Sequence, residues 1–336
     1  MLQLDAKTLE MIQKNCKGKK HIKLTVGLLS DDERLVKTFG EMGEIENENF
    51  TYEIGSVTKT FTASLLAKHI HEGKMSLEDS IQKYVKGLGE DRYYPTLRRL
   101  VTHTAGYSFT LPLTKGEYFK MALKMIKSNE DSGAFPFSMD FEKMKRLLEG
   151  NVLKDKDYGW KYSNFSLALV GYAIGVASGM GYHVAMSDFL TTELGLAHTY
   201  LGNDPNKNIH GYTGKNIDCG NWIWGEDLTA PAGDISSTAE DLLTYAEINI
   251  NADRDRPYMT ACHQKYADIK IPFLKKYSIG LGWMLHKDNS SVIWHTGGTG
   301  AFSSYLGVDK DNRRAAVVLA NYRIEPTKIG EAILLG

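Results

Sequence analysis

Apolar and polar positions along the chain divide it into two β-rich ends and a helical middle. Residues 5–15 have helical spacing, and three alternating or apolar runs after them predict strands: His21–Leu29, Arg34–Phe39 and Phe50–Ile54. The carboxyl end predicts four more strands, separated by turn-forming residues such as those at 309–312: Tyr277–Leu285, Val292–His295, Phe302–Val308 and Ala315–Ala320.

Between these ends the apolar positions follow helical periodicity. The predicted helices are Val57–His71, Leu97–Thr102, Glu117–Lys127, Phe141–Glu149, Phe165–Ala177 and Leu242–Ile250, the last opened by a capping box at Ser237-Thr238-Ala239-Glu240. Strands at both ends around a helical middle predict an α+β fold, in which one antiparallel sheet is built from both chain ends and a mainly helical lobe is inserted. We therefore expect residues 1–60 and 230–336 to form the sheet lobe, flanked by helices, and residues 61–229 to form the helical lobe.

Composition narrows the class of partner. The 336 residues include 40 basic and 41 acidic side chains, a formal net charge of −1, with no basic tract of the kind that binds nucleic acid. A small molecule or a short peptide is the expected partner, and the oligomeric state stays open. The first residues soon become charged and build no signal-peptide core, which predicts a cytoplasmic protein, or an extracytoplasmic one if a leader has been removed. The three cysteines (Cys16, Cys219, Cys262) are widely spaced, which predicts reduced thiols.

One segment resembles a membrane span. Leu167–Met186 contains no Asp, Glu, Lys or Arg, and its glycines recur every four residues at 171, 175 and 179. Its other residues are mostly small and only weakly apolar, so a buried helix that packs closely against its neighbours is the better interpretation. We expect no membrane span.

The first candidate for chemistry is Ser56, in Gly55-Ser56-Val57-Thr58-Lys59. Ser56 opens a helical run, so Lys59 lies one turn further along the same face, the arrangement that a lysine-activated serine nucleophile requires. Burial by the apolar positions of that helix would disfavour the ammonium form and leave Lys59 able to accept the hydroxyl proton. A second copy of the pattern, Ser80-Ile81-Gln82-Lys83, lies in a polar stretch and is interpreted as chance.

Two further clusters carry chemically useful groups. Tyr162-Ser163-Asn164 precedes an apolar helix, so a phenol that moves a proton and an amide could face one cavity, although Asn or Ser is also an ordinary helix cap. His295-Thr296-Gly297-Gly298 ends a strand, where successive glycines let backbone N–H groups approach a bound carbonyl; a plain hairpin is the alternative. The similar His103-Thr104-Ala105-Gly106 lacks a preceding strand and is interpreted as a structural turn.

Taken in order, these motifs resemble the serine β-lactamase and penicillin-binding-protein superfamily, particularly its class C β-lactamase, DD-peptidase and esterase-like branch. Supporting stretches include Leu100-Val101-Thr102-His103-Thr104-Ala105-Gly106 and Ala230-Pro231-Ala232-Gly233-Asp234. The resemblance, which spans residues 5–335, implies a β-lactamase/transpeptidase-like fold and an acyl-enzyme at Ser56. It implies that Lys59 and Tyr162 share the proton transfers and that Asn164 orients the lysine and the substrate. It also implies an oxyanion hole from the N–H groups of Ser56 and Gly298, with Thr296 and Gly297 facing the substrate.

His295 departs from the pattern, since dedicated class C β-lactamases usually have lysine there. A histidine supplies a cation for a substrate carboxylate only when it is protonated. The expected function is therefore a serine hydrolase of small esters, amides, D-amino-acid peptides or β-lactams; a non-catalytic penicillin-sensing or ligand-binding relative and a true class C-like β-lactamase are the alternatives. No Gly-x-Ser-x-Gly, His-Glu-x-x-His or phosphate-binding glycine motif occurs, so no cofactor or metal is expected.

The long loops are the least predictable part of the chain. Residues 202–234 are rich in Gly, Asn and Asp but also contain Tyr212, Trp222 and Trp224. These rings either wall a binding cleft or simply pack under the loop.

Overall fold

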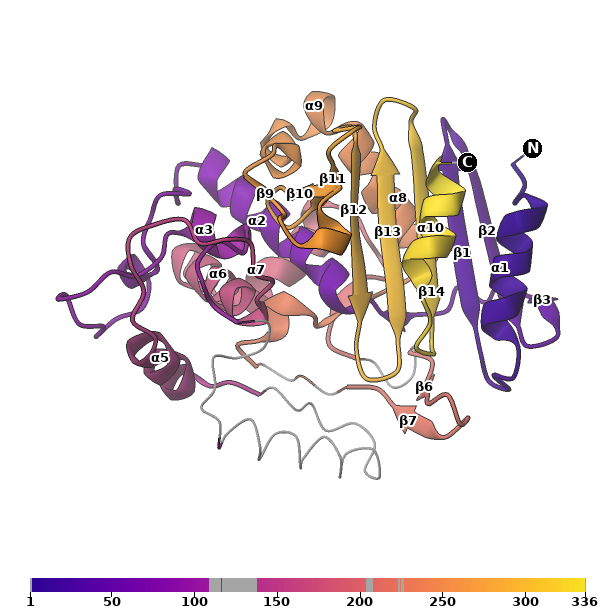
Figure 1. The fold of residues 1–336 in the computed structure, drawn as a ribbon, viewed down its shortest axis with the longest axis horizontal. Helices are drawn as coiled ribbons and strands as arrows, with labels where there is room; N and C mark the ends of the chain where they lie inside the picture. Colours follow the sequence, from indigo (N-terminus) through magenta and orange to yellow (C-terminus); the bar gives the residue numbers. More distant parts are fainter. Residues whose placement is uncertain are drawn as a thin grey trace.

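A large antiparallel sheet dominates the computed structural model, which describes residues 2–108, 116, 138–203, 208–222, 224 and 227–335 (Figure 1). Within the described residues, nine strands form this sheet in the order β3-β2-β1-β14-β13-β12-β11-β10-β9. Their bounds are β1 Leu24–Ser30, β2 Glu33–Gly40, β3 Gly43–Ile45, β9 Ala267–Asp268, β10 Tyr277–Ile279, β11 Met284–His286, β12 Val292–Gly298, β13 Ser303–Asp309 and β14 Arg314–Ala320.

The two chain ends meet in the middle of this sheet, as predicted. Strand β1 pairs with β14 from Leu24 opposite Ala320 to Ser30 opposite Arg314, and both strands are almost wholly buried. The predicted strand Tyr277–Leu285 was wrong: it is a hairpin of two short strands, β10 and β11, that turns through residues 280–283. Gly282 has φ +72° there, a conformation that glycine adopts readily, so the chain reverses instead of continuing.

Helices cover both faces of the sheet. Figure 1 shows α1 (Ala6–Cys16) and α10 (Pro326–Leu335) on one face and α8 (Ala239–Ile250) on the other. Ile12 and Ile329 belong to one buried cluster, and Leu243 belongs to the other. The N-cap of α8 is Thr238, whose side chain accepts from Asp241 N, one residue later than the predicted capping box implied, because Ser237 is part of strand β8.

The remaining helices pack beside one end of the sheet, around α2 (Thr58–His71) and α6 (Asn164–Ser178). The other α-helices are α3 Leu97–Val101, α5 Phe141–Gly150, α7 Tyr182–Asp188 and α9 Ala252–Asp255. The short turns are η1 Gly55–Val57, η2 Ile81–Lys83, η3 Phe189–Glu193, η4 Ala230–Ala232, η5 Pro257–His263 and η6 Pro272–Leu274. The short strands are β4 Tyr52–Glu53, β5 Tyr200–Leu201, β6 Gly211–Tyr212, β7 Asp218–Gly220 and β8 Ile235–Ser237. The predicted helix Glu117–Lys127 lies outside the described residues, and the two-lobe division stays a prediction.

Helix α6 contains most of the segment that resembles a membrane span, and its residues from Phe165 to Gly171 are buried in the protein. Among the described helices, none is both long enough and apolar enough to span a bilayer alone. One pair of described helices, Asn164–Ser178 and Tyr182–Glu193, would meet that criterion together, but the two are bent by 81° relative to each other.

The three cysteines are free thiols, as predicted; Cys16 and Cys262 are buried. Burial raises the pKa of the Cys16 thiol to about 11 and that of Cys262 to about 12. Neither thiol is therefore an ionised nucleophile near neutral pH.

Candidate active site

Ser56 lies in η1, the single turn between strand β4 and helix α2. Gly55 before it has φ +50°, and a Cβ at Gly55 would lie only 2.6 Å from the backbone nitrogen of Gly298. A side chain at position 55 would therefore push strand β12 away from the serine. The glycine lets the end of β12 lie directly against the turn that carries Ser56.

The amine of Lys59 lies 2.9 Å from Ser56 Oγ, one helical turn along α2. Lys59 is 0% exposed, and its Nζ also donates to the carbonyl oxygen of Ala232 at 2.6 Å. Burial holds the pKa of Lys59 well below its usual value. The structure thus places beside the serine hydroxyl an amine that can be neutral and accept a proton.

Tyr162 is the third residue beside Ser56 and Lys59 that could take part in proton transfer. Its ring centroid is 4.8 Å from Lys59 Nζ. Burial raises the pKa of Tyr162, and its hydrogen bond with Ser56 lowers it by less. The phenol therefore remains protonated, so it can pass a proton on, whereas the neutral lysine is the better proton acceptor.

Asn164 lies at the start of helix α6, two residues after Tyr162. It is the first residue of α6, after the N-cap Ser163, and its Oδ1 is buried without a hydrogen-bond partner among the described residues. Among the described residues, no hydrogen bond joins Asn164 to Lys59, whose amine donates to the carbonyl oxygen of Ala232. Both roles expected of Asn164, orientation of the lysine and contact with a substrate, stay predictions.

His103 supports the tyrosine, a contact that the sequence did not reveal. His103 lies just after helix α3 and has φ +59°, a backbone conformation typical of turns, which agrees with its interpretation as a structural turn. Its ring lies 4.6 Å from that of Tyr162, centroid to centroid, and its Nδ1 accepts from Ser163 N at 3.1 Å. Burial, with smaller contributions from Lys59 and His295, holds the pKa of His103 well below its usual value, so the ring is neutral.

Strand β12 brings the third cluster to the same place. A Cβ at Gly297 would overlap the carbonyl oxygen of Ile54, so glycine is needed for this close approach. Ser304 Oγ on β13 donates to that same carbonyl at 2.6 Å, which fixes the sheet to the residues before Ser56. Gly298 N lies next to Gly55, and Ser56 N lies next to Gly297, so the two backbone nitrogens expected to form the oxyanion hole belong to adjoining segments; the hole itself stays a prediction.

His295 and Thr296 precede the two glycines on strand β12. Burial lowers the pKa of His295 to about 3, and the nearby Lys59 contributes. Nδ1 lies 2.7 Å from the Thr296 carbonyl oxygen, so in the neutral ring Nδ1 carries the proton and donates it. His295 therefore supplies no cation near neutral pH. The hydroxyl of Thr296 donates to Ser304 O at 2.9 Å.

Arg323 provides a cation at this site, which sequence reasoning missed. It follows β14, and its Nη1 donates to the carbonyl oxygens of Thr299 and Phe302 at 3.2 and 3.1 Å. A Cβ on Gly298 would overlap this same Nη1, so the guanidinium lies against the strand end that carries the candidate oxyanion donor. The only available signal was a single arginine directly after a buried strand.

A cavity of about 650 Å³ opens beside Ser56. Its lining includes Ser56, Tyr162, Arg323 and all four residues of the His295–Gly298 motif. The three clusters of the sequence analysis, which lie about a hundred residues apart in the chain, thus face one space. Trp222 and Trp224 pack instead against Gly300 and Gly233, outside this lining, and Tyr212 stacks on His21 and Tyr322.

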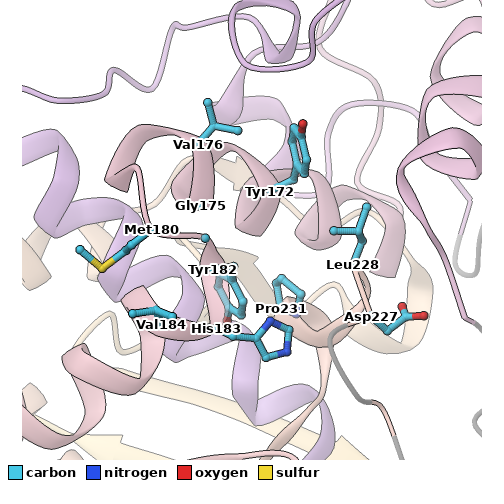
Figure 2. A pocket seen from close by; sticks show the side chains of 11 residues that line it. Tyr172, Gly175, Val176, Met180, Tyr182, His183, Val184, Asp227, Leu228 and Pro231 are labelled. Carbon is cyan, nitrogen blue, oxygen red and sulfur yellow. The ribbon is translucent and has the colours of Figure 1, made fainter.

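A second cavity, of about 340 Å³, lies between α6, α7 and the segment that ends at Pro231 (Figure 2). Pro231 directly precedes Ala232, whose carbonyl holds Lys59. Figure 2 shows the lining side chains, which are mostly apolar, with His183 and Asp227 among them. The carboxylate of Asp227 is already engaged, since it accepts from the backbone N–H groups of Met139 and Thr229.

Two buried carboxyl groups lie close behind the nucleophile. Glu53, on β4, accepts from Trp222 N at 2.7 Å, and burial raises its pKa to about 7. Burial, together with the charge of Glu53, raises the pKa of Asp234 to about 8; His183 Nε2 lies 4.0 Å from its Oδ2, and neither carboxylate oxygen has a hydrogen-bond partner in the described part of the chain. The sequence signal for Glu53 was one carboxylate inside an otherwise apolar run.

Replacing Asp234 by Asn should make the protein more stable at alkaline pH. Between the ordinary aspartate pKa of 3.8 and the folded value of about 8, Asp234 binds a proton in the folded state but not in the unfolded state. The free energy of unfolding therefore falls as pH rises through this window, and the Asn variant should resist that fall by about 1–3 kcal/mol. Urea unfolding from pH 5 to pH 8.5 measures it, with the exposed Asp311→Asn as control. Parallel pH profiles for Asp234→Asn and wild type would contradict this assignment.

No group of three or more His, Cys, Asp or Glu side chains in the described residues is arranged to hold a metal ion. The polar groups that line the cavity include the Ser56 hydroxyl, the Tyr162 phenol, the neutral His295 imidazole and the Arg323 guanidinium, and the buried Lys59 amine lies directly behind Ser56. This arrangement is the one that a lysine-activated serine nucleophile requires.

Comparison with known proteins identifies the family. A family model described as Beta-lactamase matches residues 24–333, so the chain belongs to the β-lactamase family. Membership of this family supports the interpretation of the chain as a hydrolase. A β-lactamase of Pseudomonas fluorescens is 26% identical in an alignment that covers 85% of this chain and 84% of that protein. Penicillin-binding protein 4* of Bacillus subtilis is 23% identical over 85% of this chain, which spans only 64% of that relative.

Solved structures agree in fold. A D-stereospecific amidohydrolase from Streptomyces sp. superposes with a TM-score of 0.75 at 21% identity, covering 98% of both chains. At this identity the likeness concerns the fold, and it confirms the predicted antiparallel sheet flanked by helices.

Proposed function

We propose that the protein is a serine hydrolase that forms an acyl-enzyme at Ser56 with small esters, amides, D-amino-acid peptides or β-lactams. The observation that carries this proposal is the buried Lys59 amine 2.9 Å from Ser56 Oγ, where Ser56 itself lines a cavity of about 650 Å³. A buried amine with a lowered pKa has little reason to lie beside a serine hydroxyl unless it accepts its proton, because burying it costs stability.

The acylation step follows from these positions. The substrate carbonyl oxygen binds the N–H groups of Ser56 and Gly298, Lys59 takes the hydroxyl proton, and Ser56 Oγ bonds to the carbonyl carbon. The negative charge that develops on the carbonyl oxygen is stabilised by the two backbone donors. The proton reaches the leaving group through Tyr162 as the carbon–oxygen or carbon–nitrogen bond breaks.

Hydrolysis of the acyl-enzyme reverses the proton movements. A water molecule gives a proton to the Lys59–Tyr162 pair while it attacks the ester carbon, and Ser56 Oγ recovers its proton as the acid leaves. His295 takes no part as an acid near neutral pH, since its pKa is about 3.

Steady-state turnover tests the proposal against its two alternatives. Chromogenic short-chain esters, D-alanyl peptides and a chromogenic lactam are each incubated with the purified chain. Multiple turnovers per chain support a hydrolase, a single stoichiometric burst identifies a penicillin-sensing relative, and turnover confined to lactams identifies a dedicated β-lactamase. No Ser56-dependent reaction with any donor would overturn the proposal.

Arg323 should select for substrates that carry a carboxylate. Its guanidinium lines the cavity beside Gly298, whereas His295 is neutral, so Arg323 provides a cation for such a group. Arg323→Gln should lower the ratio of kcat/KM for a carboxylate-bearing peptide or lactam to that for an uncharged ester by about tenfold. The exposed Arg254→Gln is the matched control. An unchanged ratio would exclude this role.

A further inference from the structure

The cavity beside Ser56 has one strongly apolar wall. Eight of its lining residues have apolar or largely apolar side chains, contributed by four separate parts of the chain. They are Trp160, Ile271, Phe273, Leu274, Met284, Trp294, Ile324 and Pro326. This wall lies beyond the polar groups that take part in the proposed proton transfers.

The base of this wall is rigid. Trp294 on β12 lies opposite Met284 on β11, and both are nearly buried, at 5% and 6% exposed. The Trp294 ring stacks on Tyr305 at 5.9 Å between centroids and contacts the edge of Tyr277 at 4.8 Å. Side chains held in this way cannot fold over to fill the cavity, so it remains open to a ligand.

The rim of the wall exposes apolar surface to water. Phe273, in η6, is 79% exposed, and the adjacent Leu274 and Ile271 are only partly buried. A large aromatic side chain at the mouth of a cavity gains nothing for folding when it remains in water. Its surface is removed from water only when something else occupies the cavity.

We propose that the substrate carries a linear or cyclic hydrocarbon group, longer than acetyl, that binds against this wall next to the scissile carbonyl. This inference rests on the proposed function and deepens it, because it names the substrate class. The group can belong to the acid or to the alcohol, since both sides of the scissile bond lie near Ser56. Burial of each methylene against the wall should raise kcat/KM about two- to fourfold until the cavity is filled.

Two ester series test the proposal. In the first, the acid of a p-nitrophenyl ester is lengthened from acetate through butyrate and hexanoate to octanoate, below micelle-forming concentrations. In the second, straight-chain alcohols are varied with acetate as the fixed acid, and release of acid is measured by titration. The expected result is a rise in kcat/KM of about tenfold or more from the shortest ester to the six-carbon ester in at least one series.

Variants at the rim connect that rise to the wall. Phe273→Ala should reduce the ratio of kcat/KM for the long to the short ester about fivefold, whereas Phe273→Leu should retain most of it. Met42→Ala, which removes an apolar side chain that is even more exposed, at 97%, from the turn between β2 and β3, is the control and should leave the ratio as in wild type.

The outcomes separate this inference from the function on which it rests. Ser56-dependent hydrolysis with a flat profile in both series overturns the apolar subsite and leaves the serine hydrolase standing. A rise that Phe273→Ala and Met42→Ala change equally also overturns it. Absence of Ser56-dependent hydrolysis of every ester overturns the proposed function itself.

Discussion

Ser56→Ala should abolish both turnover and formation of a covalent adduct, with kcat lowered by at least about a thousandfold. The variant keeps the cavity, the oxyanion donors and the neighbouring Lys59, but it removes the oxygen that bonds to the substrate carbon. The intact mass after incubation with an activated ester or penicillin measures the adduct, and steady-state hydrolysis measures turnover.

The chain supplies its own control for this experiment. Ser80 belongs to a second Ser-x-x-Lys, but it caps the single turn η2 by accepting from Gln82 N, while Lys83 pairs with Asp79. Ser80→Ala should therefore retain full activity and lose at most about 1 kcal/mol of stability with the cap. An adduct that persists in Ser56→Ala, or disappears in Ser80→Ala, would contradict the assignment of the nucleophile.

The contrast between these two serines shows what local sequence can predict. Ser56 and Lys59 are three residues apart in one helical run, so helix geometry alone places their side chains together. The apolar positions around them predicted burial, which the structure confirms for Lys59 at 0% exposed. The pairing of the chain ends was predictable for a similar reason, because the patterns at both ends predict strands and those in the middle predict helices.

Other features depend on contacts between distant residues, which periodicity does not encode. Tyr162 and Gly298 could be assigned to the site only through the joint pattern of motifs and its family resemblance. The contacts of His103 with Tyr162 and of Arg323 with the end of β12 left no trace in the spacing. The hairpin at 277–286 was predictable in principle, since Gly280 and Gly282 interrupt its apolar run.

Lys59→Met should abolish activity while it stabilises the fold. The variant removes the proton acceptor for Ser56, so kcat should fall at least about a thousandfold, as for loss of the nucleophile. It also removes an amine that is buried with a strongly lowered pKa. Between the lowered pKa of Lys59 in the fold and 10.5, the ordinary pKa of a lysine, the unfolded chain binds a proton at this residue that the folded chain does not bind, so the free energy of unfolding of the wild type rises with pH across this window.

The stability gain should therefore depend on pH. At pH 7, Lys59→Met should be about 1–3 kcal/mol more stable than wild type, even though the Ala232 carbonyl loses a donor, and the difference should shrink as pH approaches 10. Urea unfolding at several pH values measures this, with Lys83→Met, at a half-exposed position in the second Ser-x-x-Lys, as control. A stability difference between Lys59→Met and wild type that does not change with pH would mean that the pKa of Lys59 is not lowered in the fold. In that case Lys59 could not be the base that activates Ser56.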